Sequence, residues 1–145
     1  MDKFSLRPAQ ETDSRVIRQL IRAERLNPTG LDWRRFIIAE ADGQFAGCAQ
    51  LKPHGDGSLE LASLAVEERF RGQGLACLLI GHLLQNSPRP LYLTCRAGLG
   101  VFYQKFGFHA LPPAEMPPYF RRLNFLAGLL MKLPGVEESL LVMRL

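Results

Sequence analysis

One stretch of this chain, residues 59–76, constrains its fold more than any other. It begins with an apolar run typical of a strand, continues as a short basic turn, and ends in the first residues of an apolar helix. This order leaves unpaired backbone N–H groups at the start of the helix, where the helix dipole also favours negative charge. A diphosphate is the natural ligand of such a turn. Gly72 and Gly74 would let the backbone approach it closely, and Arg71 would add positive charge.

Composition limits the class of protein. The chain has 145 residues, of which 47% are hydrophobic and 22% are charged, as in one soluble globular domain with its own core. A formal net charge of +4 favours an anionic ligand. Without a dense basic run it does not indicate nucleic acid. No apolar run is long enough to span a membrane and the first residues do not form a signal peptide, so we expect a cytoplasmic protein with no membrane partner.

The cysteines give no sign of a metal site. Cys48, Cys77 and Cys95 are widely spaced and odd in number, and no Cys-x-x-Cys pair or histidine cluster accompanies them. Each lies among apolar residues, which predicts buried thiols in a reducing compartment.

Periodicity and turn signals predict one α+β domain over residues 1–145. We expect strands at 4–7, 35–40, 45–52, 58–66, 91–95, 108–111 and 140–145, and helices at 11–25, 74–85, 99–106 and 119–133. Most of the sheet should be antiparallel, but strands 58–66 and 91–95 should be parallel because a helix separates them. Helix 74–85 has almost no polar face, so it should lie buried, with His82 as a core histidine.

These residues resemble the GNAT superfamily of acetyl-CoA-dependent N-acetyltransferases. The family's Arg/Gln-x-x-Gly-x-Gly/Ala turn fits residues 71–76, and 69–74 fits the same letters; we prefer the later register because it leads directly into the helix. The segment LRPA at 6–9, followed by Asp13, and the segment VFYQKFGF at 101–108 are similar to two further family signatures. The resemblance implies a GNAT-like mixed, mostly antiparallel central sheet flanked by helices.

The resemblance also implies acetyl-CoA as the cofactor, with CoA as its product. The residues implied in binding the diphosphate and the pantetheine arm are Arg71, Gly72, Gln73, Gly74, Leu75 and Ala76, and Leu64, Ala65 and Val66. The last three would pair with the arm through their backbone, as an added strand does. Two alternatives are a turn that merely requires glycine and a dinucleotide-binding turn, which would lack its third small residue at Cys77.

Acetyl transfer needs a proton for the departing thiolate. By resemblance Tyr103 supplies it; the alternative is an aromatic ring that only packs against neighbouring phenylalanines. No base lies near Cys95 in the sequence, so we expect direct transfer in a ternary complex rather than an acetyl-cysteine intermediate.

The amine must also lose a proton before it attacks. Glu60 matches a glutamate that takes this proton in some family members, often through water; the alternative is a salt bridge at the strand edge. Alternation would put Glu60 on one strand face with residues 62, 64 and 66. His54 and His109 are weaker candidate bases.

A helical insertion at about 114–136 precedes the last strand, where the family usually has a short hairpin. We expect it to form a wall or lid beside the acceptor, with Arg121 and Arg122 favouring a carboxylate-bearing acceptor. Core packing, a homodimer contact and a helix lying on a membrane surface are the alternatives.

The expected function is therefore N-acetylation of a primary amine, in a small molecule or a peptide. The alternative is a non-catalytic acyl-CoA-binding regulatory module, which keeps the diphosphate turn but has no productive acceptor pocket.

Overall fold

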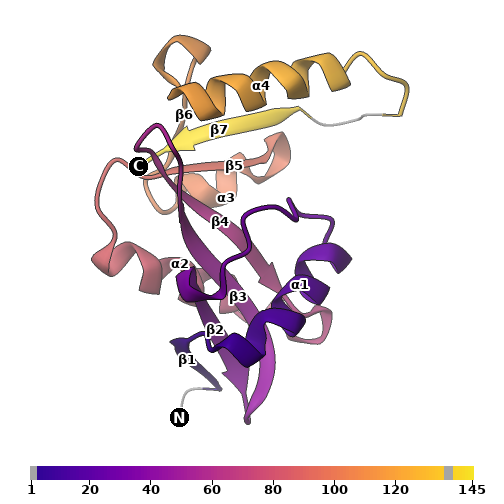
Figure 1. Ribbon diagram of the computed structural model, residues 1–145, viewed down its shortest axis with the longest axis vertical. Coiled ribbons are helices and arrows are strands. Elements are labelled where there is room, and N and C mark those ends of the chain that lie inside the picture. The colour runs from indigo at the N-terminus through magenta and orange to yellow at the C-terminus, as the bar shows by residue number, and fades with distance from the viewer. Residues whose placement is uncertain (1–2, 136–138) are drawn as a thin grey trace. The chain divides into compact units, whose positions relative to one another are not determined.

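The computed structural model describes residues 3–135 and 139–145 and forms two compact units (Figure 1). The first contains Met1–Lys52 and Leu61–Ser87, and the second contains Pro53–Glu60 and Pro88–Leu145. Seven strands form a mostly antiparallel sheet, which confirms the predicted α+β class. Strand β4 (Leu59–Val66) belongs to the second unit through its first two residues and to the first unit through the rest.

In the first unit, each strand pairs with the strand that follows it in the chain. Its elements are β1 (Phe4–Pro8), α1 (Ser14–Ala23), β2 (Phe36–Ala41), β3 (Gln44–Pro53, whose last residue lies in the second unit), most of β4, and α2 (Leu75–Asn86). Strands β1 and β2, and β2 and β3, are antiparallel. The apolar side of α1, with Ile17 and Ile21, packs with Phe36 and Ile38 into a buried core.

An ion pair fixes the start of α1. The Arg7 guanidinium donates to both carboxylate oxygens of Asp13, at 2.8 and 2.9 Å, and Asp13 also accepts the Gln10 backbone N–H at 2.7 Å. The predicted helix 11–25 begins instead with a 3-10 turn, Glu11–Asp13, and ends before Arg25, whose φ of 57° is left-handed.

The second unit holds the rest of the sheet. Its elements are β5 (Tyr92–Arg96), α3 (Gly100–Gln104), β6 (His109–Ala110), α4 (Pro118–Leu130) and β7 (Leu140–Arg144). Strand β5 is antiparallel to β7 and, as predicted, parallel to the start of β4, with Glu60 opposite Tyr92. Figure 1 shows α4, the predicted insertion helix, lying along β7. Further 3-10 turns lie at Trp33–Arg35, Glu68–Phe70, Ala97–Leu99 and Pro113–Glu115.

Helix α4 has one buried end and one exposed face. Phe120 in its first turn is fully buried and forms a core cluster with Tyr92 and Val142. Farther along, the side chains Phe125, Leu126, Leu129 and Leu130 are exposed. The first turn is therefore core packing, which was one of the alternatives for this segment.

Two predictions for α2 are wrong. Leu75, Leu79, Ile80 and Leu83 are buried, but Cys77 and His82 are exposed, and Leu78 is 42% exposed. A helix that packs on one side keeps its opposite side in solvent even when that side is apolar, so composition alone overestimated burial. Among the described residues, no helix is long and apolar enough to cross a membrane.

Candidate active site

The glycine turn in the first unit leads into α2 as predicted. Gly72 and Gly74 have φ values of 73° and 83°, which favour glycine, and Gly74 is the N-cap of the helix. The Leu78 N–H bonds to the Gly74 carbonyl at 3.1 Å, so the N–H groups before it have no acceptor within the helix. A Cβ atom on either glycine would meet no atom within 4 Å. The turn therefore faces open space and can accept an anion.

The side chains of this turn are held by other parts of the first unit. Arg71 forms an ion pair with Glu24, the C-cap residue of α1. The Gln73 side chain accepts a hydrogen bond from Lys3 and donates to the Arg69 carbonyl at 3.2 Å. Positive charge is present at the turn, but an intramolecular carboxylate partly neutralises it.

Strand β4 has an irregularity beside its predicted pantetheine-binding residues. Ser63 takes a left-handed φ of 57° inside the strand. The regular alternation predicted from Glu60 to Val66 is broken there, because a left-handed residue kinks a strand locally. Leu64, Ala65 and Val66 follow this kink and end the strand.

A buried glutamine that sequence reasoning missed supports the kink. Gln50 on β3 is fully buried, and its side-chain amide donates to Ser63 Oγ at 2.9 Å and to the Gly30 carbonyl at 3.3 Å. Its Oε1 has no hydrogen-bond partner in the described part of the chain. Nothing in the sequence distinguished Gln50 from a solvent-facing strand residue.

Tyr103 lies on α3 in the second unit and is buried, with 9% of its surface exposed. Its ring packs edge-to-face against Phe102 and Phe108, at centroid distances of 5.1 and 6.3 Å. Burial, and to a lesser extent the nearby Cys95, raises the pKa of Tyr103 to about 12. The hydroxyl therefore keeps its proton at neutral pH and can donate it.

The structure pairs two residues that the sequence offered separately as candidate bases. His54 Nε2 lies 2.8 Å from Glu60 Oε1, and their side chains are only 7% and 9% exposed. The imidazole also stacks on Tyr119 from α4, with centroids 3.6 Å apart and an interplanar angle of 17°. The third candidate, His109, is exposed on β6.

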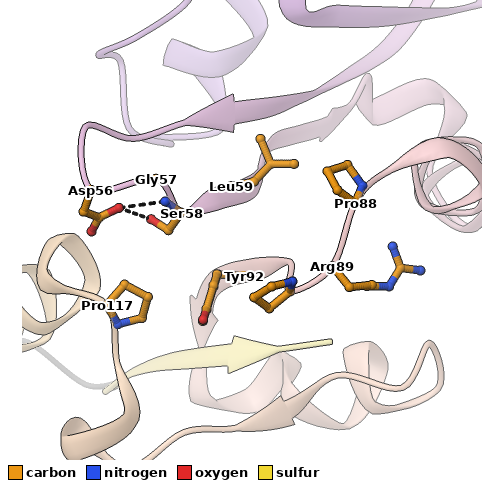
Figure 2. A pocket seen from close by; sticks show the side chains of 9 residues that line it. Asp56, Gly57, Ser58, Leu59, Pro88, Arg89, Tyr92 and Pro117 are labelled. Atoms are coloured by element: carbon orange, nitrogen blue, oxygen red, sulfur yellow. Dashed lines mark hydrogen bonds between the residues drawn. The ribbon is translucent and has the colours of Figure 1, made fainter.

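A cavity of about 310 Å³ lies in the second unit (Figure 2). Asp56 and Ser58 lie on one side, Pro88 and Arg89 on the other, and Tyr92 between them (Figure 2). Asp56 accepts hydrogen bonds from the Ser58 N–H and hydroxyl, at 2.8 and 2.6 Å, and from the Tyr119 N–H at 2.9 Å. Partial burial raises the pKa of Asp56, but these bonds outweigh it and lower the pKa to about 2. The Asp56 carboxylate thus helps to hold the conformation of the turn between β3 and β4.

The predicted site residues are divided between the two units. The glycine turn and Leu64–Val66 lie in the first, whereas Glu60 and Tyr103 lie in the second. No group of three His, Cys, Asp or Glu side chains that could hold a metal ion occurs among the residues described.

Known proteins are similar to this chain in sequence pattern and in fold. The family profile of the acetyltransferase (GNAT) domain matches residues 32–110. The N-acetylglutamate synthase from Neisseria gonorrhoeae, complexed with coenzyme A and L-arginine, has a TM-score of 0.75 at 24% identity over 100% of this chain. The chain spans only 34% of that synthase.

Two further solved structures match nearly end to end. Rv2747 from Mycobacterium tuberculosis, in complex with CoA and NLQ, has a TM-score of 0.74 at 18% identity, over 97% of this chain and 98% of its own. The ribosomal-protein-S18-alanine N-acetyltransferase from Escherichia coli has a TM-score of 0.67 at 17% identity, over 98% and 92%. At these identities the likeness establishes the fold. No curated protein sequence matches the chain.

Proposed function

The chain belongs to the GNAT family of acetyltransferases, and on that premise we propose that it transfers an acetyl group from acetyl-CoA to a primary amine. We further propose that residues 1–145 act as one acetyltransferase domain. The acceptor is the amine of a small molecule or a peptide.

The observation that carries this proposal is the open glycine turn at the start of α2. Both glycines have positive φ, no atom lies within 4 Å of where a Cβ would stand, and the helix begins with N–H groups that have no intrahelical acceptor. These features suit the diphosphate of CoA. The residues proposed to bind the cofactor are Arg71, Gly72, Gln73, Gly74, Leu75 and Ala76 for the diphosphate, and Leu64, Ala65 and Val66 for the pantetheine arm.

Two residues of the second unit carry the proton transfers in this proposal. Bound acetyl-CoA supplies the thioester whose carbonyl carbon the amine nitrogen attacks. Glu60 takes the proton of that nitrogen, directly or through water, as a new C–N bond forms. Tyr103 gives its hydroxyl proton to sulfur as the C–S bond breaks. The raised pKa of Tyr103 keeps that proton available.

The state of the thiols supports direct transfer. Burial raises the pKa of Cys95, and burial followed by the charge of Glu67 raises the pKa of Cys48 to about 12. Both thiols therefore stay protonated at neutral pH and are poor nucleophiles. This favours attack by the amine itself over an acetyl-cysteine intermediate.

The test combines CoA binding with a screen for turnover. Calorimetry should show CoA binding to the wild-type chain, and at least one amine in a panel of amino acids, polyamines, aminoglycosides and peptides should consume acetyl-CoA. Absence of CoA binding at millimolar concentration would refute the proposal. CoA binding without turnover of any amine would favour a non-catalytic acyl-CoA-binding regulatory module.

A further inference from the structure

We propose that His54 is a positioning residue, which holds the Glu60 carboxylate in place while the helical insertion holds His54. This inference rests on the proposed function, in which Glu60 is the base. It gives the insertion a role other than the lid or acceptor wall expected from the sequence.

The first support is the chemistry of the 2.8 Å contact between His54 Nε2 and Glu60 Oε1. The proposed base must be ionised, and an ionised carboxylate can only accept hydrogen bonds, so in this proposal Nε2 carries the shared proton. Both side chains are more than nine-tenths buried. In such surroundings a donor stabilises the ionised form of a carboxylate, which is the form that can take a proton from an amine.

The second support is the set of rings around the imidazole. Tyr119 stacks on it at 3.6 Å, and Phe120 meets it edge-on at 5.5 Å with an angle of 84°. Both rings come from the first turn of α4. The Tyr119 N–H also donates to Asp56, on the same β3–β4 turn that carries His54. The insertion therefore fixes the imidazole by ring packing and by a hydrogen bond to its turn.

The groups around His54 allow a clear pH experiment. The titratable side chains near it are Glu60 on β4, Asp56 on its own turn and Tyr119 on α4. Asp56 has a pKa of about 2, and burial together with Glu60 raises the pKa of Tyr119 above its usual value. Neither titrates near neutral pH, so neither accounts for a changed acidic limb in that range.

Two substitutions at His54 test separately the loss of its hydrogen-bond donor and the loss of its aromatic ring. His54→Phe keeps a ring for Tyr119 but removes the donor, whereas His54→Gln keeps an amide donor but removes the ring. With an amine that the wild type acetylates, we expect kcat to fall about 10- to 100-fold in His54→Phe and to stay within about threefold in His54→Gln. The acidic limb of the kcat/KM profile should move to higher pH only in His54→Phe, because its carboxylate loses a donor. The KM for acetyl-CoA should not change in either.

The inference would be overturned if His54→Phe kept the kcat and the acidic limb of the wild type. It would also be overturned if kcat fell equally in both variants. Melting temperatures identify a variant that has not folded. Nitrogen NMR of the wild-type imidazole then provides an activity-independent test, since a His54 Nε2 without a proton near neutral pH contradicts the pairing. Failure of the proposed function looks different: the wild type turns over no amine, or Glu60→Gln retains full turnover.

Discussion

The guanidinium of Arg71, at the glycine turn, forms an ion pair with Glu24 at the end of α1. Arg71 is one of the residues proposed to bind the diphosphate of CoA, so by that proposal Glu24 competes with the cofactor for the same cation. Glu24→Gln removes this competitor. The pair is half-exposed, and such pairs contribute about 0.2–1 kcal/mol, so we expect CoA affinity to rise about two- to fivefold in calorimetry. Arg71→Gln should lower the affinity instead; a Glu24→Gln variant that binds CoA more weakly would contradict the competition.

Gly72 and Gly43 form a matched pair for testing the turn. Both have positive φ, at 73° and 76°, and a Cβ on either would meet no atom within 4 Å. Alanine at each should therefore cost a similar free energy of unfolding, about 1–2 kcal/mol, from backbone strain alone. Only Gly72→Ala should also weaken CoA binding, by about tenfold or more, because its methyl group would enter the space proposed for the diphosphate. Equal CoA affinity in the two variants would show that the diphosphate binds elsewhere.

Tyr103→Phe tests the proposed acid. It removes one hydroxyl from a buried ring, so CoA affinity and melting temperature should stay close to those of the wild type. We expect kcat to fall about 100- to 10,000-fold, because the departing thiolate loses its proton donor. Since the pKa of Tyr103 is about 12, its proton remains in place through the neutral and mildly alkaline range. Unchanged kcat in this variant would reduce Tyr103 to a packing residue.

The sequence predicted the elements well where local chemistry decides them. The glycine turn that leads into α2 and the parallel pairing of β4 with β5 both follow from residue types and connection lengths. Side-chain partners depend on the fold as a whole. His54 and Glu60 are six positions apart, yet only the path of the β3–β4 turn shows that they meet.

Burial was harder to predict for the same reason. His82 and Cys77 lie in an apolar helix but face solvent, because packing on one side of a helix cannot cover the other. The left-handed Ser63 interrupts a run that reads as a regular strand. Its support by the buried Gln50 involves a residue type that is usually exposed, so no sequence signal indicates it.

Asp13 should make stability depend on acid pH. Its hydrogen bonds from Arg7 lower its pKa below the ordinary value of 3.8, and those bonds outweigh the opposing effect of burial. A carboxyl group whose pKa is lowered by folding stabilises the folded state at pH values above its unfolded-state pKa. This stability is lost as the pH falls through the folded-state pKa. We expect Asp13→Asn to cost about 1–2 kcal/mol at neutral pH, allowing for the partial exposure of Arg7, and less at strongly acid pH.

Urea unfolding at several pH values measures this difference. Glu11→Gln, on the same 3-10 turn but at an exposed carboxyl, is the control and should change stability little. A cost in Asp13→Asn that is the same at acid and neutral pH would show that the ion pair is not its source.

Two phenylalanines of α4, one buried and one exposed, should differ strongly in how much stability their loss costs. Phe120 is 0% exposed and packs against Tyr92 and His54, whereas Phe125 is 66% exposed. Phe120→Ala leaves a cavity in the core of the second unit and should cost about 3–5 kcal/mol. Phe125→Ala should change the unfolding free energy by no more than about 0.5 kcal/mol when measured at low protein concentration. If Phe125→Ala instead lowers a melting temperature that rises with protein concentration, the exposed face of α4 is a contact between copies of the chain, because only an association makes stability depend on concentration.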